Sequence, residues 1–146
     1  MPKTELRTEV EIDAPPERVW SVLSDFARYH EWNPFITRVE GELREGARIS
    51  VTMSLPEGGE HTFRPTIARA SPAQELCWLG HVLVKGIFDG EHFFRLEALE
   101  SGRTRVVHGE NFSGFLLRFM GRTLTLTARG FVYMNQALKR RVEAGA

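Results

Sequence analysis

The residues MGRTLTLTARGFVYMNQALKRRVE, 120–143, predict one long helix with two unlike faces, and the rest of the architecture can be built around it. At about 100° per residue, its apolar or small residues stay within about 80° of arc. These residues are Met120, Leu124, Thr127, Phe131, Met134, Leu138 and Val142. Roughly opposite them lie Arg118, Arg122, Arg129 and Arg140. We therefore expect an amphipathic helix over about residues 115–143, with Leu124, Phe131, Met134 and Leu138 buried and the arginines solvated.

The chain before this helix, from Phe35 to about Phe112, has the turn spacing of an antiparallel sheet. Turn signals at residues 45–46, 56–59, 71–73, 85–86 and 101–102 separate strand-like runs. Within the runs alternate residues are apolar, as at Ile49, Val51, Met53 and Leu55. An antiparallel sheet with one apolar face requires a cover, and the C-terminal helix carries the matching stripe.

The N-terminal part adds one strand and two short helices. Residues 4–13 alternate between apolar and charged side chains, which predicts a half-buried strand. The stretch APPERVWSVLSD, residues 14–25, opens a helix on two prolines, and FARYH, residues 26–30, predicts a second short helix. The order predicts an α+β fold in which a curved antiparallel sheet of about seven strands wraps around the long C-terminal helix. Such an arrangement leaves a cavity between its layers.

Four stretches of the chain resemble the START-like superfamily, also called the Bet v 1-like, SRPBCC or helix-grip fold. They are EIDAPPERVWSVLSDFARYHEWNPFI (residues 11–36), FDGEHFFRLEAL (88–99), TRVVHGENFSG (104–114) and GFVYMNQALKRRVE (130–143). More narrowly, the chain looks like the bacterial polyketide cyclase/dehydrase and lipid-transport group. The resemblance implies the helix-grip fold. The resemblance indicates the fold more firmly than the function, because members include ligand carriers, aromatase/cyclases, lyases and proteins that act on chaperones or ribosomes.

Composition and sequence motifs limit the classes of protein to which the chain can belong. The 146 residues are 42% hydrophobic and 26% charged, which predicts a single domain over residues 1–146. The lone cysteine, Cys77, excludes an internal disulfide framework and a cysteine-based zinc site. No signal-peptide pattern and no run of ~20 apolar residues occurs, so we expect a cytoplasmic protein without a membrane span. Nucleotide-binding and nucleophile-elbow motifs are absent and the histidine spacing does not favour a metal site, so no cofactor or metal is expected.

The hairpin before the helix places ionisable residues on the apolar face. His108 and Glu110 alternate with Val106 and Phe112, so they share one side of the strand. A three-residue loop over residues 100–102, with its glycine left-handed, pairs Leu99 with Arg103. Counting back, Phe94 lies opposite His108, and His92 lies opposite Glu110. We therefore predict that His92 and Glu110 are cross-strand partners, with His108 one step along the same face.

The aromatic residues supply the candidate pocket walls. An apolar cavity with a few polar groups is typical of a ligand site, although any single aromatic residue can simply fill the core. The ligand-binding candidates are Trp20, Trp32, Phe35, Phe63, Trp78, His92, Phe94, His108, Glu110, Phe112, Phe115 and Phe131. The candidates for acid–base catalysis are His92, His108 and Glu110, which can equally form a polar pair that only fixes the strand register.

Three functions follow from these features. The first is binding of a hydrophobic or amphipathic small molecule, such as a lipid, polyketide or aromatic compound. The second is a cyclase, dehydratase or lyase that uses the same cavity. The third is an interaction protein that docks through the C-terminal region, because residues 113–146 hold six basic residues and one acidic residue. No recognisable catalytic set occurs, which favours the first function, and we expect no nucleic-acid partner.

Overall fold

The computed structural model describes residues 3–82 and 86–145. Its elements follow in the order β1 (Lys3–Ile12), α1 (Pro16–Leu23), η1 (Phe26–Glu31), β2 (Ile36–Glu40), β3 (Ser50–Leu55), β4 (Gly59–Phe63), β5 (Thr66–Ser71), β6 (Glu75–Val82), β7 (Phe88–Ala98), η2 (Glu100–Gly102), β8 (Thr104–Ser113), η3 (Phe115–Phe119) and α2 (Gly121–Glu143), where η marks a 3-10 helix. The α+β class, the two short helices after the first strand and the long C-terminal helix are confirmed. None of the described helices is both long enough and apolar enough to cross a bilayer.

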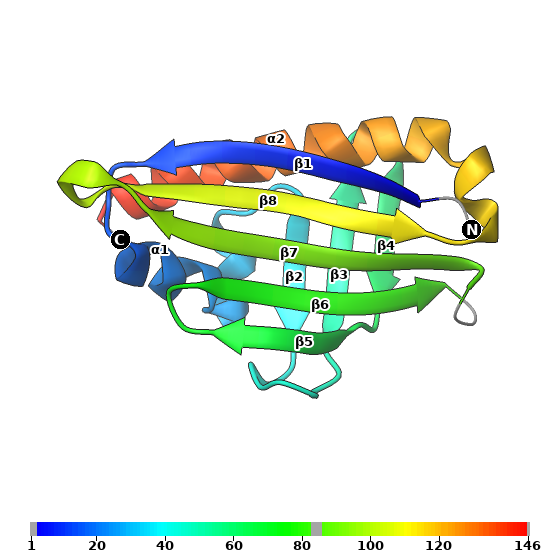
Figure 1. Ribbon diagram of the computed structural model, residues 1–146, viewed down its shortest axis with the longest axis horizontal. Coiled ribbons are helices and arrows are strands. Elements are labelled where there is room, and N and C mark those ends of the chain that lie inside the picture. Colours follow the sequence, from blue (N-terminus) through cyan, green and yellow to red (C-terminus); the bar gives the residue numbers. More distant parts are fainter. Residues whose placement is uncertain (1–2, 83–85, 146) are drawn as a thin grey trace.

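The strands form two antiparallel sheets. Five strands lie in the order β1-β8-β7-β6-β5, and three in the order β2-β3-β4. Figure 1 shows the smaller sheet behind the larger one, with its strands running in a different direction, and α2 along the upper side. A bridge between Arg48 and Thr66 joins the sheets, together with backbone hydrogen bonds from Gly46 and Ile67. The described residues thus contain eight strands rather than about seven, because Pro65 divides the run between two predicted turns into β4 and β5.

Helix α2 covers the larger sheet much as its periodicity predicts. Phe131, Met134 and Leu138 are buried, and the four arginines of the opposite face are exposed. Leu124 is only half-buried, and Leu126 is buried nearby instead. The helix begins at Gly121 rather than near residue 115, because η3 comes first and its leading backbone amides bind the carbonyls of Gly86 and Ile87.

Gly130, near the middle of α2, allows the helix from there to its C-terminal end to lie close to the rest of the core. A Cβ atom on Gly130 would collide with the ring of Phe35. The Phe35 ring in turn packs edge-on against Phe131, with 5.5 Å between ring centres. This half of the interface between helix and sheet is therefore solid, and free space lies toward the N-terminal half of α2.

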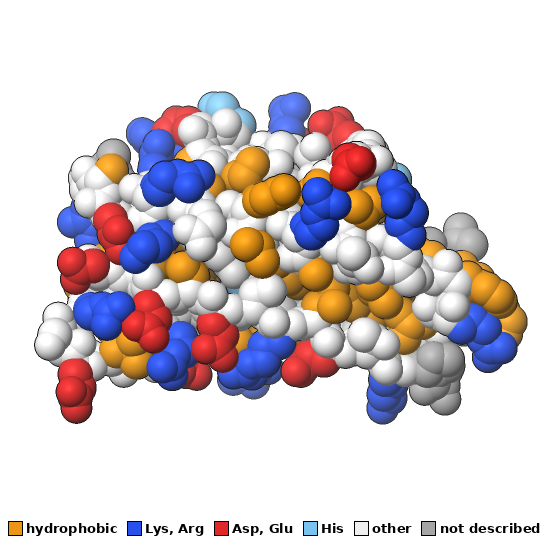
Figure 2. Space-filling model, turned by 90° about the horizontal axis from the view of Figure 1, so that it is seen from above, with side chains coloured by type: hydrophobic (Ala, Val, Ile, Leu, Met, Phe, Trp, Pro, Cys, Tyr) orange, Lys and Arg blue, Asp and Glu red, His pale blue; other side chains and the backbone are white. Residues whose placement is uncertain are grey.

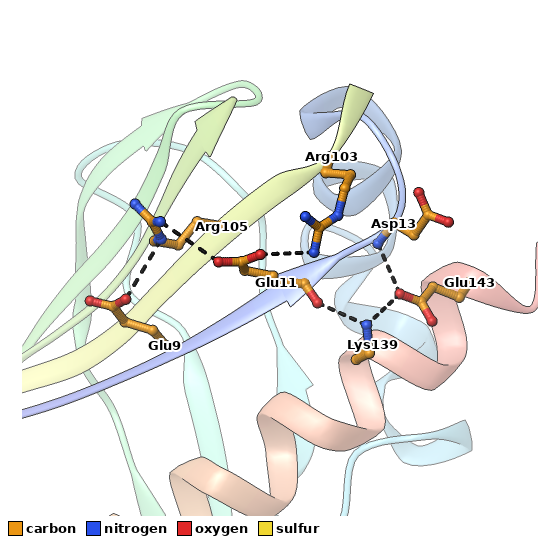
Figure 3. Close-up of polar contacts among 7 residues, drawn as sticks. All are labelled: Glu9, Glu11, Asp13, Arg103, Arg105, Lys139 and Glu143. Carbon is orange, nitrogen blue, oxygen red and sulfur yellow. Dashed lines mark hydrogen bonds and ion pairs between the residues drawn. The ribbon is translucent and has the colours of Figure 1, made fainter. Parts of the chain in front are cut away.

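Hydrogen bonds fasten the C-terminal end of α2 to β1 and to Asp13 just after it (Figure 3). Lys139 Nζ donates to the Glu11 carbonyl at 2.9 Å and to Glu143 at 2.7 Å, and Glu143 also accepts the Asp13 amide. Arg103, just before the neighbouring β8, pairs with the Glu11 carboxylate at 2.8 Å. These contacts position the helix end that lies far from the free space.

The β7–β8 hairpin has the predicted register. His92 lies opposite Glu110, Phe94 opposite His108, and Leu96 opposite Val106. The amide of Leu99 binds the carbonyl of Arg103 at 2.8 Å, and Gly102 has a φ of 73°. The loop chemistry therefore fixes which residues of β7 and β8 face α2. Of the predicted turn at residues 85–86, Gly86 is a turn residue, whereas Lys85 lies outside the described residues.

Candidate functional site

A pocket of about 590 Å³ lies between the inner face of the sheets and the N-terminal half of α2. Strands β6, β7 and β8 form one wall, and β3 with the β3–β4 hairpin forms another. Most of its side chains are apolar, among them Met53, Leu55, Trp78, Phe88, Phe112 and Leu126. The polar and charged side chains at its surface include His81, His92, Glu110, Arg122 and Thr127. A mostly apolar cavity with a few polar groups has the usual form of a small-molecule site.

The structure brings five of the twelve ligand-binding candidates to this pocket: Phe63, Trp78, His92, Glu110 and Phe112. Four others fill the core instead, with at most 1% of their surface exposed: Phe35, Phe94, His108 and Phe131. The close approach of α2 at Gly130 leaves no cavity beside them. These four side chains therefore lie behind the residues that line the pocket.

The remaining three candidates lie away from the pocket. Trp20 belongs to α1, and Trp32 follows η1 and packs on Tyr29 with 5.2 Å between ring centres. Phe115 is 54% exposed on η3, where the Arg118 guanidinium lies 5.1 Å from its ring centre. None of these three side chains lines the pocket: Trp20 and Trp32 lie in or beside helices that pack elsewhere, and Phe115 is exposed although its neighbour Leu116 lines the pocket.

Periodicity also missed several residues that line the pocket. Leu126 lies outside the predicted apolar stripe of the C-terminal helix, and Leu116 belongs to η3, which was expected to be part of that helix. Arg122 was assigned to the solvated face but lines the pocket as well. By contrast, the apolar alternation that includes Met53 and Leu55 already predicted that these two side chains face inward from a strand.

The basic C-terminal region is not a uniform positive surface. Figure 2, a view from above the molecule in Figure 1, shows acidic and basic side chains mixed with apolar ones over this face. Arg129 pairs with Glu57 at 3.2 Å, Arg141 with Glu31 at 2.6 Å, and Lys139 with Glu143 at 2.7 Å. Half of the six basic residues are thus matched by acidic partners.

A chain of hydrogen bonds leads from the pocket into the core. Glu110 Oε1 lies 3.1 Å from His92 Nδ1, and His92 Nε2 lies 2.9 Å from His108 Nε2. His108 Nδ1 lies 2.8 Å from Asn135 Oδ1, and Asn135 Nδ2 donates to Thr8 Oγ1 at 2.8 Å. Thr8 Oγ1 donates to the His108 carbonyl at 2.7 Å. The chain joins β8, β7, α2 and β1, and Glu110 is its pocket end.

The inner end of this chain fixes the direction of its hydrogen bonds. A carbonyl oxygen only accepts, so the Thr8 hydroxyl donates to it and accepts from the Asn135 amide nitrogen. The Asn135 oxygen therefore faces His108 Nδ1, which carries hydrogen. If His108 is neutral, its Nε2 accepts from His92 Nε2, and His92 Nδ1 is left to accept from Glu110. A neutral chain therefore requires a protonated Glu110.

Burial supports this assignment of the proton. It raises the pKa of Glu110 to about 8 and lowers the pKa of His92 to about 3. It also lowers the pKa of His108, to which the neighbouring His92 contributes in the same sense. Glu110 thus keeps its proton at neutral pH, while both histidines are uncharged. The predicted pairing of His92 with Glu110 is confirmed by the strand register and by the hydrogen bond between the two side chains.

These shifts predict a stability maximum near pH 6.5. Below it, the unfolded chain binds more protons than the folded protein, because both histidines have lowered pKa values; their contribution outweighs that of Glu110, so stability rises with pH. Between about pH 6.5 and 8 the raised pKa of Glu110 outweighs the lowered pKa values of the histidines, and stability falls as the pH rises. The expected loss by pH 9 is about 1 kcal/mol, since the unfolded histidines are still partly protonated just above pH 6.5.

Urea unfolding at several pH values measures this profile. Glu110→Gln removes the titrating proton and is expected to abolish the decline above about pH 6.5. Glu60→Gln, an exposed change on β4, is the control and keeps the decline. The range ends at pH 9, because burial also raises the pKa of Cys77, to about 12. An unchanged decline in Glu110→Gln contradicts the assignment of the proton to Glu110.

Gly90 on β7 makes room for the Glu110 carboxyl group. A Cβ atom on Gly90 would collide with Glu110 Oε2, whereas one on Gly80, which lines the same pocket from β6, would meet Pro65 at an ordinary 3.6 Å. Gly90→Ala is therefore expected to cost about 1–3 kcal/mol of unfolding free energy, and Gly80→Ala much less. Equal urea midpoints for the two variants would show that the Glu110 carboxyl group moves aside at little cost and is not held in this position.

A second histidine–carboxylate pair lies at the pocket edge. His81 Nδ1 is 2.9 Å from Asp89 Oδ1, and the Asp89 carboxylate also accepts the Gly86 amide. This pair holds the ends of the β6–β7 connection together. In residues 3–82 and 86–145, no group of three or more His, Cys, Asp or Glu side chains is arranged to hold a metal ion.

Comparison with known proteins identifies a family for the chain. A family model described as polyketide cyclase/dehydrase and lipid transport matches residues 3–143. A START superfamily protein from Mycobacterium smegmatis has 18% sequence identity and a TM-score of 0.78, with 97% of this chain and 99% of that chain covered. The Zhui aromatase/cyclase from Streptomyces sp. R1128 has 18% identity and a TM-score of 0.79, with 97% and 94% covered.

A third solved structure, a protein from Thermus thermophilus, has 22% identity and a TM-score of 0.75, with 98% of this chain and 99% of that chain covered. At these identities the likeness shows a common fold. A comparison with curated protein sequences gives no match.

Proposed function

Since the chain belongs to the polyketide cyclase/dehydrase and lipid transport family, we propose that it binds a hydrophobic or amphipathic small molecule between the sheets and α2. The observation that carries the proposal is the pocket of about 590 Å³, with mostly apolar walls and one buried carboxyl group. Burial of an apolar ligand surface there contributes about 25 cal/mol per Å². Lipids, polyketides and aromatic compounds fit this chemistry.

Native mass spectrometry after incubation with a lipid and metabolite extract tests the proposal. The parent protein is expected to retain an apolar species. Leu55→Trp fills the pocket from β3 and is expected to reduce retention at least about tenfold, since a blocked site loses its buried contacts. Leu79→Trp makes the same change on the outer face of β6, where Leu79 is 40% exposed, and serves as the matched control. Equal retention by all three proteins would place binding outside this pocket.

One observation favours a second candidate, an enzyme of the cyclase or dehydratase type. Glu110 lines the pocket and keeps its proton at neutral pH, and His92 lies directly behind it. Because Oε1 holds its hydrogen toward His92, Oε2 can accept a proton from a substrate while the Oε1 proton moves to His92, which suits general base catalysis. The mass of the retained species separates the candidates: a binder returns it unchanged, whereas a dehydratase returns it without one water molecule, and Glu110→Gln prevents that loss.

A further inference from the structure

The hydrogen-bond chain determines which carboxyl oxygen of Glu110 meets a ligand. Oε1 is engaged with His92 Nδ1. Oε2 lies over Gly90, a glycine of the pocket wall, and within the described part of the chain it makes no hydrogen bond. The Glu110 side chain is 14% exposed, so this oxygen end is not sealed from the cavity.

The chemical character of Oε2 does not depend on where the proton of the chain lies. With the proton on Oε1, Oε2 is a carbonyl-type oxygen. With the proton on His92 or His108, Oε2 belongs to a carboxylate. In each arrangement the hydrogen faces inward, along the chain that ends at Asn135 and Thr8, and Oε2 has only lone pairs to offer.

We infer that Glu110 Oε2 is a fixed hydrogen-bond acceptor that selects, among apolar ligands, those that carry a hydroxyl group, as an alcohol or a phenol. The inference rests on the proposed function and names its ligand class. A ketone or an ether of the same shape presents lone pairs to Oε2, so both oxygens lose their water without a partner. The chain behind His92 keeps the hydrogen of the carboxyl group inward, because a turned group would leave the lone pair of His92 Nδ1 facing another lone pair.

Equilibrium dialysis with 2-naphthol and 2-methoxynaphthalene tests this selection, because the two probes share the apolar rings and differ in the hydroxyl hydrogen. Near pH 6.5 both are uncharged, and the parent protein is expected to bind 2-naphthol about tenfold more tightly. Glu110→Leu removes the acceptor and is expected to bind both probes equally. Glu110→Gln is expected to keep the preference, because its amide nitrogen donates to His92 Nδ1 and its carbonyl oxygen takes the place of Oε2.

Each outcome of this experiment supports or overturns the selection by Glu110 Oε2. Equal binding of the two probes by the parent protein overturns the selection but leaves the proposed function in place, because the apolar pocket still binds. A preference that survives in Glu110→Leu, or disappears in Glu110→Gln, shows that another group recognises the hydroxyl. Failure of the parent protein to bind either probe overturns the selection of phenols, and retention in native mass spectrometry then decides the proposed function separately. The parent comparison requires no variant, so it stands even if Glu110→Leu folds poorly.

Discussion

Phe131→Ala is expected to lower the free energy of unfolding by about 3–5 kcal/mol, the usual cost of deleting a fully buried aromatic side chain. The Phe131 ring has no exposed surface. It stacks on His108 with 4.2 Å between ring centres, and it meets His92 edge-on at 5.1 Å. The close approach of α2 at Gly130 limits how far the helix can move inward to fill the space left by the ring.

Urea denaturation of the variant and its parent measures this loss. The control is Val132→Ala on the next residue of α2, where the side chain is 46% exposed. That change is expected to alter stability by no more than about 0.5 kcal/mol. A Phe131→Ala protein as stable as the control would contradict the packing of α2 against the sheet.

The register of the β7–β8 hairpin could be predicted because local chemistry determines it. The loop over residues 100–102 sets which residues pair, and each step of two residues along the strands then stays on one face. The pairing of His92 with Glu110 followed from counting alone. The direction of the hydrogen bond and the position of its proton did not, because they depend on His108 and on the groups behind it.

The rest of the hydrogen-bond chain could not be predicted from local patterns. Thr8 and Asn135 are 127 residues apart, and they meet only because β1 pairs with β8 while α2 crosses both. Asn135 lies beside the apolar stripe of α2, and the sequence around it does not predict that its amide is buried against His108. Polar groups at such positions are recognised only when the tertiary structure shows what they bind.

The extent of the cavity also could not be predicted from sequence patterns. Phe94 and Trp78 both face inward from the sheet, yet Trp78 lines the pocket and Phe94 fills the core. The difference is the distance between helix and sheet along the length of α2. Contact at Gly130 closes one half of the interface, whereas Thr127 and the residues before it leave the other half open.

His108→Leu is expected to lower the free energy of unfolding by about 3–5 kcal/mol, although leucine is apolar and the site is fully buried. The change leaves two buried polar groups without a partner, the His92 Nε2 hydrogen and Asn135 Oδ1, at about 1–3 kcal/mol each. It also removes the stacking of the imidazole on Phe94 and Phe131. His30→Leu, an exposed change on η1, is the control and is expected to be near neutral.

A double-mutant cycle separates the hydrogen-bond chain from simple packing. Asn135→Leu alone leaves the His108 Nδ1 hydrogen unpaired, but in the His108→Leu background it removes the orphaned Oδ1 instead. The double variant is therefore expected to be more stable than the sum of the single losses predicts, by about 1–2 kcal/mol. Urea unfolding of all four proteins measures this coupling. Additive losses would mean that His108 stabilises the core by its volume alone, without a net contribution from its hydrogen bond to Asn135.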